Sequence, residues 1–249
     1  MSPLTAPPPL KHIERMTPPP LPAAPRLVLF DLDDTLCDYA SARVRRLEVA
    51  FRIAFEEAGI ELGSDIGLLV DESITMQPHS TEHFGELLGR HGVENTGAVR
   101  AARQWFSGNR FHTLELYNDA VQTLELVRGC AGVERIGLVT NGPSEVQRHK
   151  IELLGIERYL DFILVSEEVG HWKPAPQIFA EALRLGAATP EETIFIGDSA
   201  ENDIAGAQAS GIAGVWINPS GREWDQGCPA PTRSVTCLAE VRRLFSIWS

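Results

Sequence analysis

Apolar and polar positions along the chain form two alternating patterns. Five short, continuous apolar runs predict strands buried on both faces, as in a parallel sheet. These runs are "RLVLF" (26–30), "IGLVT" (136–140), "FILVS" (162–166), "TIFIG" (193–197) and "GVWIN" (214–218). Amphipathic stretches of helical length lie between them. The alternation predicts an open, doubly wound α/β sheet.

Two of the amphipathic stretches follow the second and third runs. In "SEVQRHKIELLGI" (144–156) the apolar positions near helical spacing are Val146, Ile151, Leu153 and Leu154. In "APQIFAEALRLGA" (175–187) they are Ile178, Phe179, Ala182, Leu183 and Leu185. Strand, helix and strand therefore follow one another as in a Rossmann-like core.

The repetition is interrupted once, between the first run and the second. About 100 residues lie there, far more than one crossover helix requires. The stretch 41–60 has an apolar helical stripe, and "TEHFGELLGRHG" and "VRAARQWF" also have helical patterns. We therefore expect a helical cap domain over residues 40–114, inserted into a catalytic core formed by 26–39 and 115–249.

The first 25 residues are dense in proline. They contain no uninterrupted apolar segment followed by a small-residue cleavage site, so they resemble neither a secretory signal nor a membrane span. We expect a disordered, polyproline-like tail over residues 1–25, and Met16 is an alternative start.

Composition excludes several classes of function. The 249 residues are 43% hydrophobic, enough for one core and a smaller attached unit, and the formal net charge of −12 is unsuited to a nucleic-acid surface. No stretch provides the ~20 apolar residues of a membrane helix. The four cysteines form no CxxC pair, so we expect reduced thiols in a cytoplasmic protein. Nothing in the sequence indicates an oligomeric state.

Polar residues follow four of the predicted strands. In a sheet of this kind, ligands bind outside the carboxyl ends of the strands, so these residues should converge on one crevice. They are Asp31, Asp33 and Asp34 after the first strand, Thr140 and Asn141 after the second, Lys173 after the third, and Asp198 and Asp203 after the fourth.

The stretch "FDLDDTL" (30–36) brings three carboxylates together. In an extended segment Asp31 and Asp33 share a face and lie ~6 to 7 Å apart, while Asp34 points away. This gap suits a phosphoryl group, because one carboxylate could attack phosphorus while the other reaches the leaving oxygen.

An anionic phosphate beside carboxylates needs positive charge. Mg²⁺ held by oxygen ligands from Asp31, Asp33 and Asp198 would supply it, and Lys173 would supply a second positive charge. Thr140 and the backbone N–H of Asn141 could donate hydrogen bonds to the equatorial oxygens.

The motifs "DLDDT", "TNG", "KP" and "GDSAEND", in this order, resemble those of the haloacid dehalogenase superfamily. The resemblance covers nearly everything after residue 26, and the insert resembles the cap of one subgroup. It implies Asp31 as nucleophile, Asp33 as acid and base, Thr140 as phosphate binder and Lys173 as charge clamp. It also implies Asp198 and the main-chain carbonyl of Asp33 as metal ligands, with Asp203 supporting the metal site or Lys173.

The function expected from these features is Mg²⁺-dependent hydrolysis of a small phosphorylated metabolite, a sugar phosphate or a nucleotide, through an aspartyl phosphate. Three alternatives remain: a 2-haloacid dehalogenase, a phosphosugar mutase and a non-catalytic binding module. Asp33 argues against the dehalogenase, because halide displacement needs no proton donor for the leaving group. A metal site at His79 and His83 is not expected, since no further ligand is evident in the sequence.

Overall fold

The computed structural model describes residues 17–61, 66–76 and 80–248. The chain separates into two compact units. One unit comprises Asp38–Glu115, and the other combines the residues before Asp38 with Leu116–Ser249. The two units are called the helical unit and the α/β unit below.

A six-stranded parallel sheet forms the centre of the α/β unit. The strands are β1 (Leu27–Phe30), β2 (Arg135–Thr140), β3 (Phe162–Val165), β4 (Thr193–Gly197), β5 (Ala213–Ile217) and β6 (Arg233–Val235), in the spatial order β3-β2-β1-β4-β5-β6. Every residue of β1 is fully buried. The predicted α/β class and the five predicted strands are confirmed, while β6, short and largely exposed, was not predicted.

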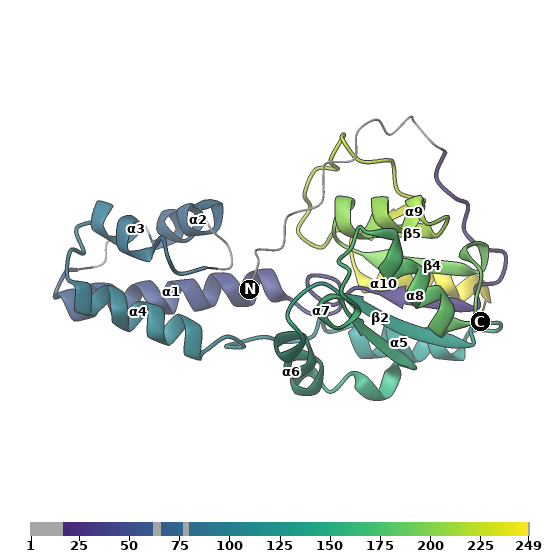
Figure 1. The fold of residues 1–249 in the computed structure, drawn as a ribbon, viewed down its shortest axis with the longest axis horizontal. Helices are drawn as coiled ribbons and strands as arrows, with labels where there is room; N and C mark the ends of the chain where they lie inside the picture. Colours follow the sequence, from purple (N-terminus) through teal and green to yellow (C-terminus); the bar gives the residue numbers. More distant parts are fainter. Residues whose placement is uncertain (1–16, 62–65, 77–79, 249) are drawn as a thin grey trace. The chain divides into compact units, whose positions relative to one another are not determined.

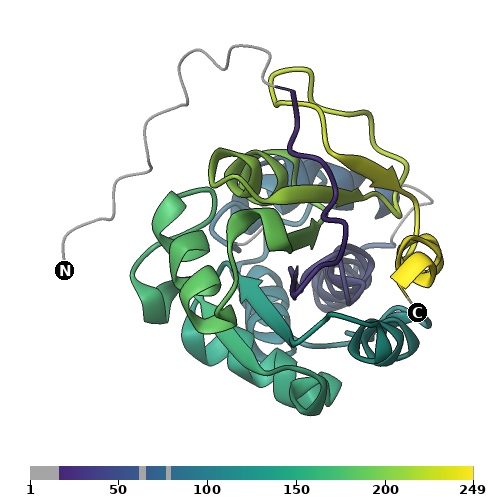
Figure 2. The ribbon, with the colours of Figure 1, turned by 90° about the vertical axis from the view of Figure 1, so that its right-hand side faces the viewer.

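Helices cover both faces of this sheet. They are α5 (Ala120–Gly129), α6 (Ser144–Leu154), α7 (Ser166–Val169), α8 (Pro176–Gly186), α9 (Gly206–Ala209) and α10 (Leu238–Phe245), with a π-helix over Ala200–Ala205 and short 3₁₀ turns at Glu157–Tyr159, Pro190–Glu192 and Ser246–Trp248. Figure 2 shows α5 and α10 together on one side of the sheet and α8 on the other. Because β1 is central, with β2 and β4 as neighbours, the segments that follow these three strands meet at one edge.

The helical unit is a bundle inserted after β1. Its helices are α1 (Tyr39–Ala58), α2 (Ile66–Met76), α3 (Phe84–Arg90) and α4 (Thr96–Gly108). The long helices α1 and α4 pack side by side (Figure 1). Phe84 joins the bundle, since its ring lies 5.0 Å from that of Phe51 and 5.5 Å from that of Phe106.

The start and end of α1 follow from local sequence. The side chain of Asp38 caps the first turn by accepting from the backbone N–H of Ser41 at 3.1 Å. Gly59 ends the helix in a left-handed conformation, with φ of 67°. These two signals delimit a helix of 20 residues.

Residues 17–25, part of the predicted tail, run along the α/β unit. The carbonyl oxygen of Pro19 accepts from Thr232 Oγ1 at 2.8 Å, and that of Ala23 accepts from Trp248 Nε1 at 2.7 Å. The remainder of the predicted tail, residues 1–16, including Met16, lies outside the described residues. Among the described helices, none has the length and apolar character required to cross a membrane.

Candidate active site

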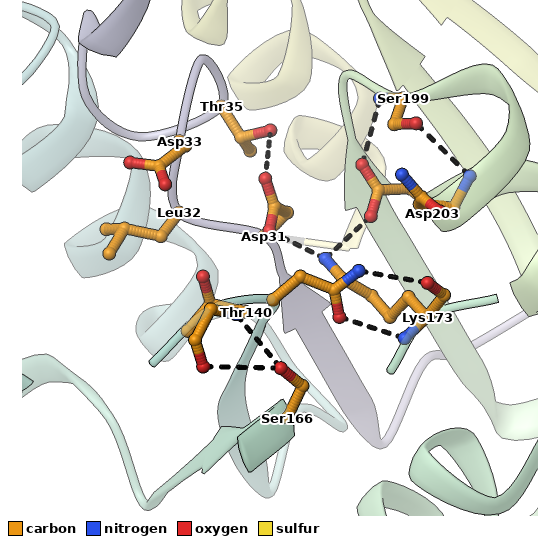
Figure 3. Close-up of polar contacts among 12 residues, drawn as sticks. Asp31, Leu32, Asp33, Thr35, Thr140, Ser166, Lys173, Ser199 and Asp203 are labelled. Atoms are coloured by element: carbon orange, nitrogen blue, oxygen red, sulfur yellow. Dashed lines mark hydrogen bonds and ion pairs between the residues drawn. The ribbon is translucent and has the colours of Figure 1, made fainter. Parts of the chain in front are cut away.

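The segment after β1 is a tight turn that separates its carboxylates. The backbone N–H of Leu36 donates to the carbonyl of Leu32 at 2.9 Å, and that of Asp34 donates to the carbonyl of Cys37 at 2.8 Å. Asp34 has a positive φ of 59°, a conformation that Asp tolerates better than most residues. Figure 3 shows the Asp33 side chain turned away from Asp31. The two carboxylates therefore have separate partners.

Lys173 links Asp31 to Asp203. Its Nζ lies 2.6 Å from Asp31 Oδ1 and 2.7 Å from Asp203 Oδ1, and all three side chains are buried (Figure 3). Asn141 fixes the backbone of this lysine, because its side-chain amide donates to the Lys173 carbonyl and accepts from the Lys173 N–H, both at 2.9 Å. Residues that follow β1, β3 and β4 thus meet at the ammonium group of Lys173.

Burial and charge act in opposition at this lysine. Burial lowers the pKa of Lys173, but the charges of Asp203 and Asp31 outweigh it, and the net effect raises the pKa. Burial also raises the pKa of Asp31 well above its usual value, against the effect of Lys173 and together with the charges of Asp203 and Asp198. The nearby carboxylates therefore keep Lys173 protonated.

Three carboxylates form a cluster that suits a metal ion. Oxygen atoms of Asp31, Asp198 and Asp203 all lie within 4.8 Å of one another. Both oxygens of Asp203 are engaged, Oδ1 by Lys173 and Oδ2 by the backbone N–H of Ser199 at 2.9 Å. In the described part of the chain, Asp198 Oδ1 accepts no hydrogen bond, and Asp31 Oδ2 accepts one long bond of 3.5 Å from Thr35.

The chemistry of this donor set fits Mg²⁺. Hard carboxylate oxygens from one or two residues are the protein ligands that Mg²⁺ prefers. The pKa of Asp198 rises to about 7, first because of burial and next because of the charge of Asp203, although Arg222 donates to Oδ2 at 2.7 Å. The cluster therefore carries more negative charge than its protein cations balance, and Asp31 and Asp198 are the residues that could hold a cation.

Glycine is required beside this cluster. A Cβ atom on Gly197 would overlap the carboxylate of Asp203, so only a residue without a side chain lets that carboxylate lie against the end of β4. Ser199 then caps the π-helix by accepting from the Asn202 N–H at 3.1 Å. The spacing in "GDSAEND" thus delivers Asp198 and Asp203 to the same cluster.

The end of β2 supplies hydroxyl and amide groups. Thr140 is buried, and its Oγ1 accepts from Gln147 Nε2 at 2.5 Å. The backbone N–H of Gly142 donates to Ser166 Oγ at 2.9 Å. The side chain of Asn141 is committed to the Lys173 backbone, so any contact of Asn141 with a ligand would come from its own backbone.

Asp33 has a partner that the sequence analysis did not identify. Lys150 Nζ lies 2.8 Å from Asp33 Oδ1 and 2.7 Å from Oδ2, and Gln147 Nε2 lies 3.3 Å from Oδ2. The carboxylate of Asp33 is absent from the described metal-ligand cluster. Gln147 and Lys150 stand three positions apart on α6, a spacing that was visible in the sequence.

Only one histidine of the pair considered above is among the described residues. His79 is outside the described residues. His83 is buried in the helical unit, where its Nε2 lies 2.7 Å from Ser73 Oγ. His83 therefore contacts a hydroxyl group and is not part of the described cluster of possible metal ligands.

Comparison with known proteins gives the family. A family model described as haloacid dehalogenase-like hydrolase matches residues 25–211. The glyceraldehyde 3-phosphate phosphatase of Methanopyrus kandleri is 34% identical over 77% of this chain and 83% of its own length. The N-acylneuraminate-9-phosphatase of Mus musculus is 29% identical over 88% of this chain and 93% of its own length.

A solved structure agrees with this assignment. The crystal structure of HAD-hydrolase YfnB from Bacillus subtilis bound to magnesium matches with a TM-score of 0.66 and 26% identity. The match covers 89% of this chain and 99% of that one. The resemblance read from the four motifs is confirmed: the chain belongs to the haloacid dehalogenase-like hydrolases, in a form with a helical insert after β1, and is an enzyme of that family.

Proposed function

We propose that this enzyme hydrolyses the phosphate monoester of a small phosphorylated metabolite through an aspartyl phosphate on Asp31. The observation that carries the proposal is the position of the Asp31 carboxylate. It is bound by the buried ammonium group of Lys173 and belongs to the cluster with Asp198 and Asp203. A nucleophile beside an ammonium group and beside carboxylates that could hold a cation is what an anionic phosphoryl group requires.

The reaction proceeds in two displacements. An oxygen of Asp31 attacks phosphorus, the bond from phosphorus to the ester oxygen breaks, and Asp33 donates a proton to the leaving alkoxide. Water then attacks the phosphorus of the aspartyl phosphate while Asp33 takes a proton from it. Inorganic phosphate leaves and the carboxylate of Asp31 is restored.

The surrounding residues assist by charge and hydrogen bonding. Lys173 offsets the charge of the phosphoryl group, and Thr140 donates its hydroxyl hydrogen to a phosphoryl oxygen. Mg²⁺, when held by Asp31, Asp198 and the main-chain carbonyl of Asp33, supplies further charge neutralisation at the phosphoryl oxygens. Asp203 supports the arrangement by holding Lys173 at 2.7 Å.

The substrate class is a sugar phosphate or a nucleotide. The support comes from the names of relatives, two of which are phosphatases of glyceraldehyde 3-phosphate and of N-acylneuraminate 9-phosphate. A third, the pyrimidine 5'-nucleotidase YjjG of Escherichia coli, is 40% identical over 51% of this chain. The helical insert, residues 40–114 in our assignment, acts as a cap that selects among substrates. Deleting residues 42–112 should therefore leave slow cleavage of p-nitrophenyl phosphate while discrimination among metabolites is lost.

The alternatives predict different products. A 2-haloacid dehalogenase would release halide without a divalent cation. Its leaving group would need no proton from Asp33. A phosphosugar mutase would return an isomeric sugar phosphate instead of inorganic phosphate. A binding module would give no product, which family membership disfavours.

A product screen separates these alternatives. Phosphorylated sugars, nucleotides and p-nitrophenyl phosphate are incubated with the full chain in EDTA and in Mg²⁺, together with 2-haloacids. We expect inorganic phosphate in Mg²⁺ and none in EDTA, with Ca²⁺ a poor substitute. Phosphate release that persists in chelator, or halide release in its place, would contradict the proposal.

A further inference from the structure

Lys150 differs from an ordinary surface lysine. It lies on α6, only 3% of its side chain is exposed, and its Nζ contacts both oxygens of Asp33, at 2.8 and 2.7 Å. The Asp33 side chain is 24% exposed, so the lysine is the buried member of the pair and the carboxylate is the member open to a ligand. The ammonium group is thus fixed from within the α/β unit.

Gln147 extends this contact to the end of β2. Its Nε2 lies 3.3 Å from Asp33 Oδ2 and 2.5 Å from Thr140 Oγ1, and only 2% of the residue is exposed. Gln147 and Lys150 are three positions apart, so both project from one face of α6. One helix face thereby connects the carboxylate of Asp33 with the hydroxyl of Thr140.

Stability alone is a weak reason for such an arrangement. A lysine taken out of water loses hydration energy, and a buried ion pair often stabilises a fold no better than apolar residues of the same volume. A charge-assisted contact to both oxygens does fix the place and rotation of a carboxylate. Catalytic groups need that control, because a displacement of about 1 Å can cost about 10²-fold in rate.

We infer that Lys150 is a positioning residue for Asp33, with Gln147 tying that carboxylate to Thr140. The inference rests on the proposed function, since it assigns Lys150 a part in proton delivery by Asp33. Lys150 acts through the carboxylate of Asp33, which its Nζ contacts. It is distinct from Lys173, whose ammonium group contacts Asp31 and Asp203.

The test compares two esters in Lys150→Met. Proton delivery matters for an alkyl phosphate and little for p-nitrophenyl phosphate, whose leaving group is acidic. We expect the first-turnover rate for the alkyl ester to fall about 10²-fold, with KM within about threefold. The first-turnover release of p-nitrophenol should fall less than about fivefold, because the attack by Asp31 is intact.

A matched control lies on the same helix. Arg148 pairs with Glu168 at 2.6 Å, and its side chain is 43% exposed. Arg148→Met removes a cation and an ion pair from α6 without touching Asp33, so both esters should react within about twofold of the parent rate. If Lys150→Met does not fold, Lys150→Gln replaces it, with the same dependence on leaving group.

A double variant shows whether Lys150 acts through Asp33. In the Asp33→Asn background, Lys150→Met should add less than about threefold to the loss on the alkyl ester, since the group it positions is already removed. Equal losses on the two esters, fully additive losses, or no loss at all would each overturn the inference. A parent enzyme that releases no phosphate from any ester would overturn the proposed function itself, which separates the two failures.

Discussion

Two buried lysines hold two of the carboxylates that follow β1, Asp31 and Asp33, and the surroundings of the two lysines differ. Lys173 bridges Asp31 and Asp203, whose side chains are only 9% and 1% exposed. Lys150 contacts Asp33, whose side chain is 24% exposed. One lysine therefore lies between two enclosed carboxylates, while the other pairs with a carboxylate at the edge of solvent.

The balance of charge also differs between the two regions. Around Asp31, one ammonium group faces a cluster of three carboxylates, and Arg222 reaches Asp198 only from an exposed position. Around Asp33, the ammonium group of Lys150 lies against both oxygens of the carboxylate. The Asp31 region is thus the one that favours a metal ion and an anionic substrate, and the Asp33 region suits proton transfer.

Asp31→Asn should have the largest effect on activity. The amide cannot act as the nucleophile, so turnover should fall by more than about 10⁴-fold for all esters. Lys173 keeps Asp203 as its partner, so the variant should fold, which its circular dichroism can check. Slow deamidation back to Asp would leave a trace of activity that grows with storage. Turnover close to the parent rate in fresh protein would remove Asp31 from the reaction.

Asp33→Asn should have a smaller effect that depends on the ester. The amide oxygen can still accept from Lys150, but it neither donates a carboxyl proton to the leaving group nor accepts one from water. General acid and base catalysis contributes about 10² to 10⁴-fold, so alkyl esters should lose that much. The loss should shrink in the first turnover of p-nitrophenyl phosphate. If stopped-flow measurements show the same loss for both esters, Asp33 has a structural role instead.

The smallest predicted effect is a change of thermal stability with pH. The pKa of Asp198 is about 7 in the fold and 3.8 in the reference state, so the folded protein binds more protons between these values. The contribution of Asp198 to stability is therefore present below pH 4 and is lost as the pH rises through about 7. Mg²⁺ should reverse this loss, because a bound cation stabilises the ionised carboxylate.

Differential scanning fluorimetry at two pH values measures that effect. We expect Mg²⁺ to raise Tm more at pH 8 than at pH 5.5, by about 2–4 °C for each kcal/mol of difference. Asp198→Asn is the control, since it should reduce the dependence on pH and leave only the part that comes from Asp31. A Mg²⁺ shift of the same size at both pH values would argue against Asp198 as a ligand.

Much of the fold was predictable because its signals are local. The five predicted strands agree with the structure to within about one residue at each end, since buried parallel strands are continuous apolar runs. The segment Ile66–Met76 was not predicted as a helix. The three-residue strand β6 was also missed, because two of its three residues are exposed and it has no apolar run.

The candidate site was predictable only where motifs follow strands. Asp31, Asp198 and Asp203 were assigned to one crevice because each follows a predicted strand of one parallel sheet, and the structure brings their carboxylates together. Lys150 was not found. The apolar stripe assigned to its helix was taken as the buried face, yet that stripe included Leu153, which is 53% exposed, and did not include Lys150, which is buried. A rule that places charged residues in solvent cannot anticipate a buried lysine whose partner lies 117 positions away.

The most direct test of the account is to identify the phosphorylated residue. Asp33→Asn is mixed with p-nitrophenyl phosphate and Mg²⁺, quenched in acid within the first turnover, and digested for mass spectrometry. We predict a burst of p-nitrophenol of at most one per active site and a phosphoryl group on Asp31, because hydrolysis of the intermediate should lag without Asp33. Absence of a burst together with an unmodified Asp31, or phosphate on another residue, would contradict the central claim.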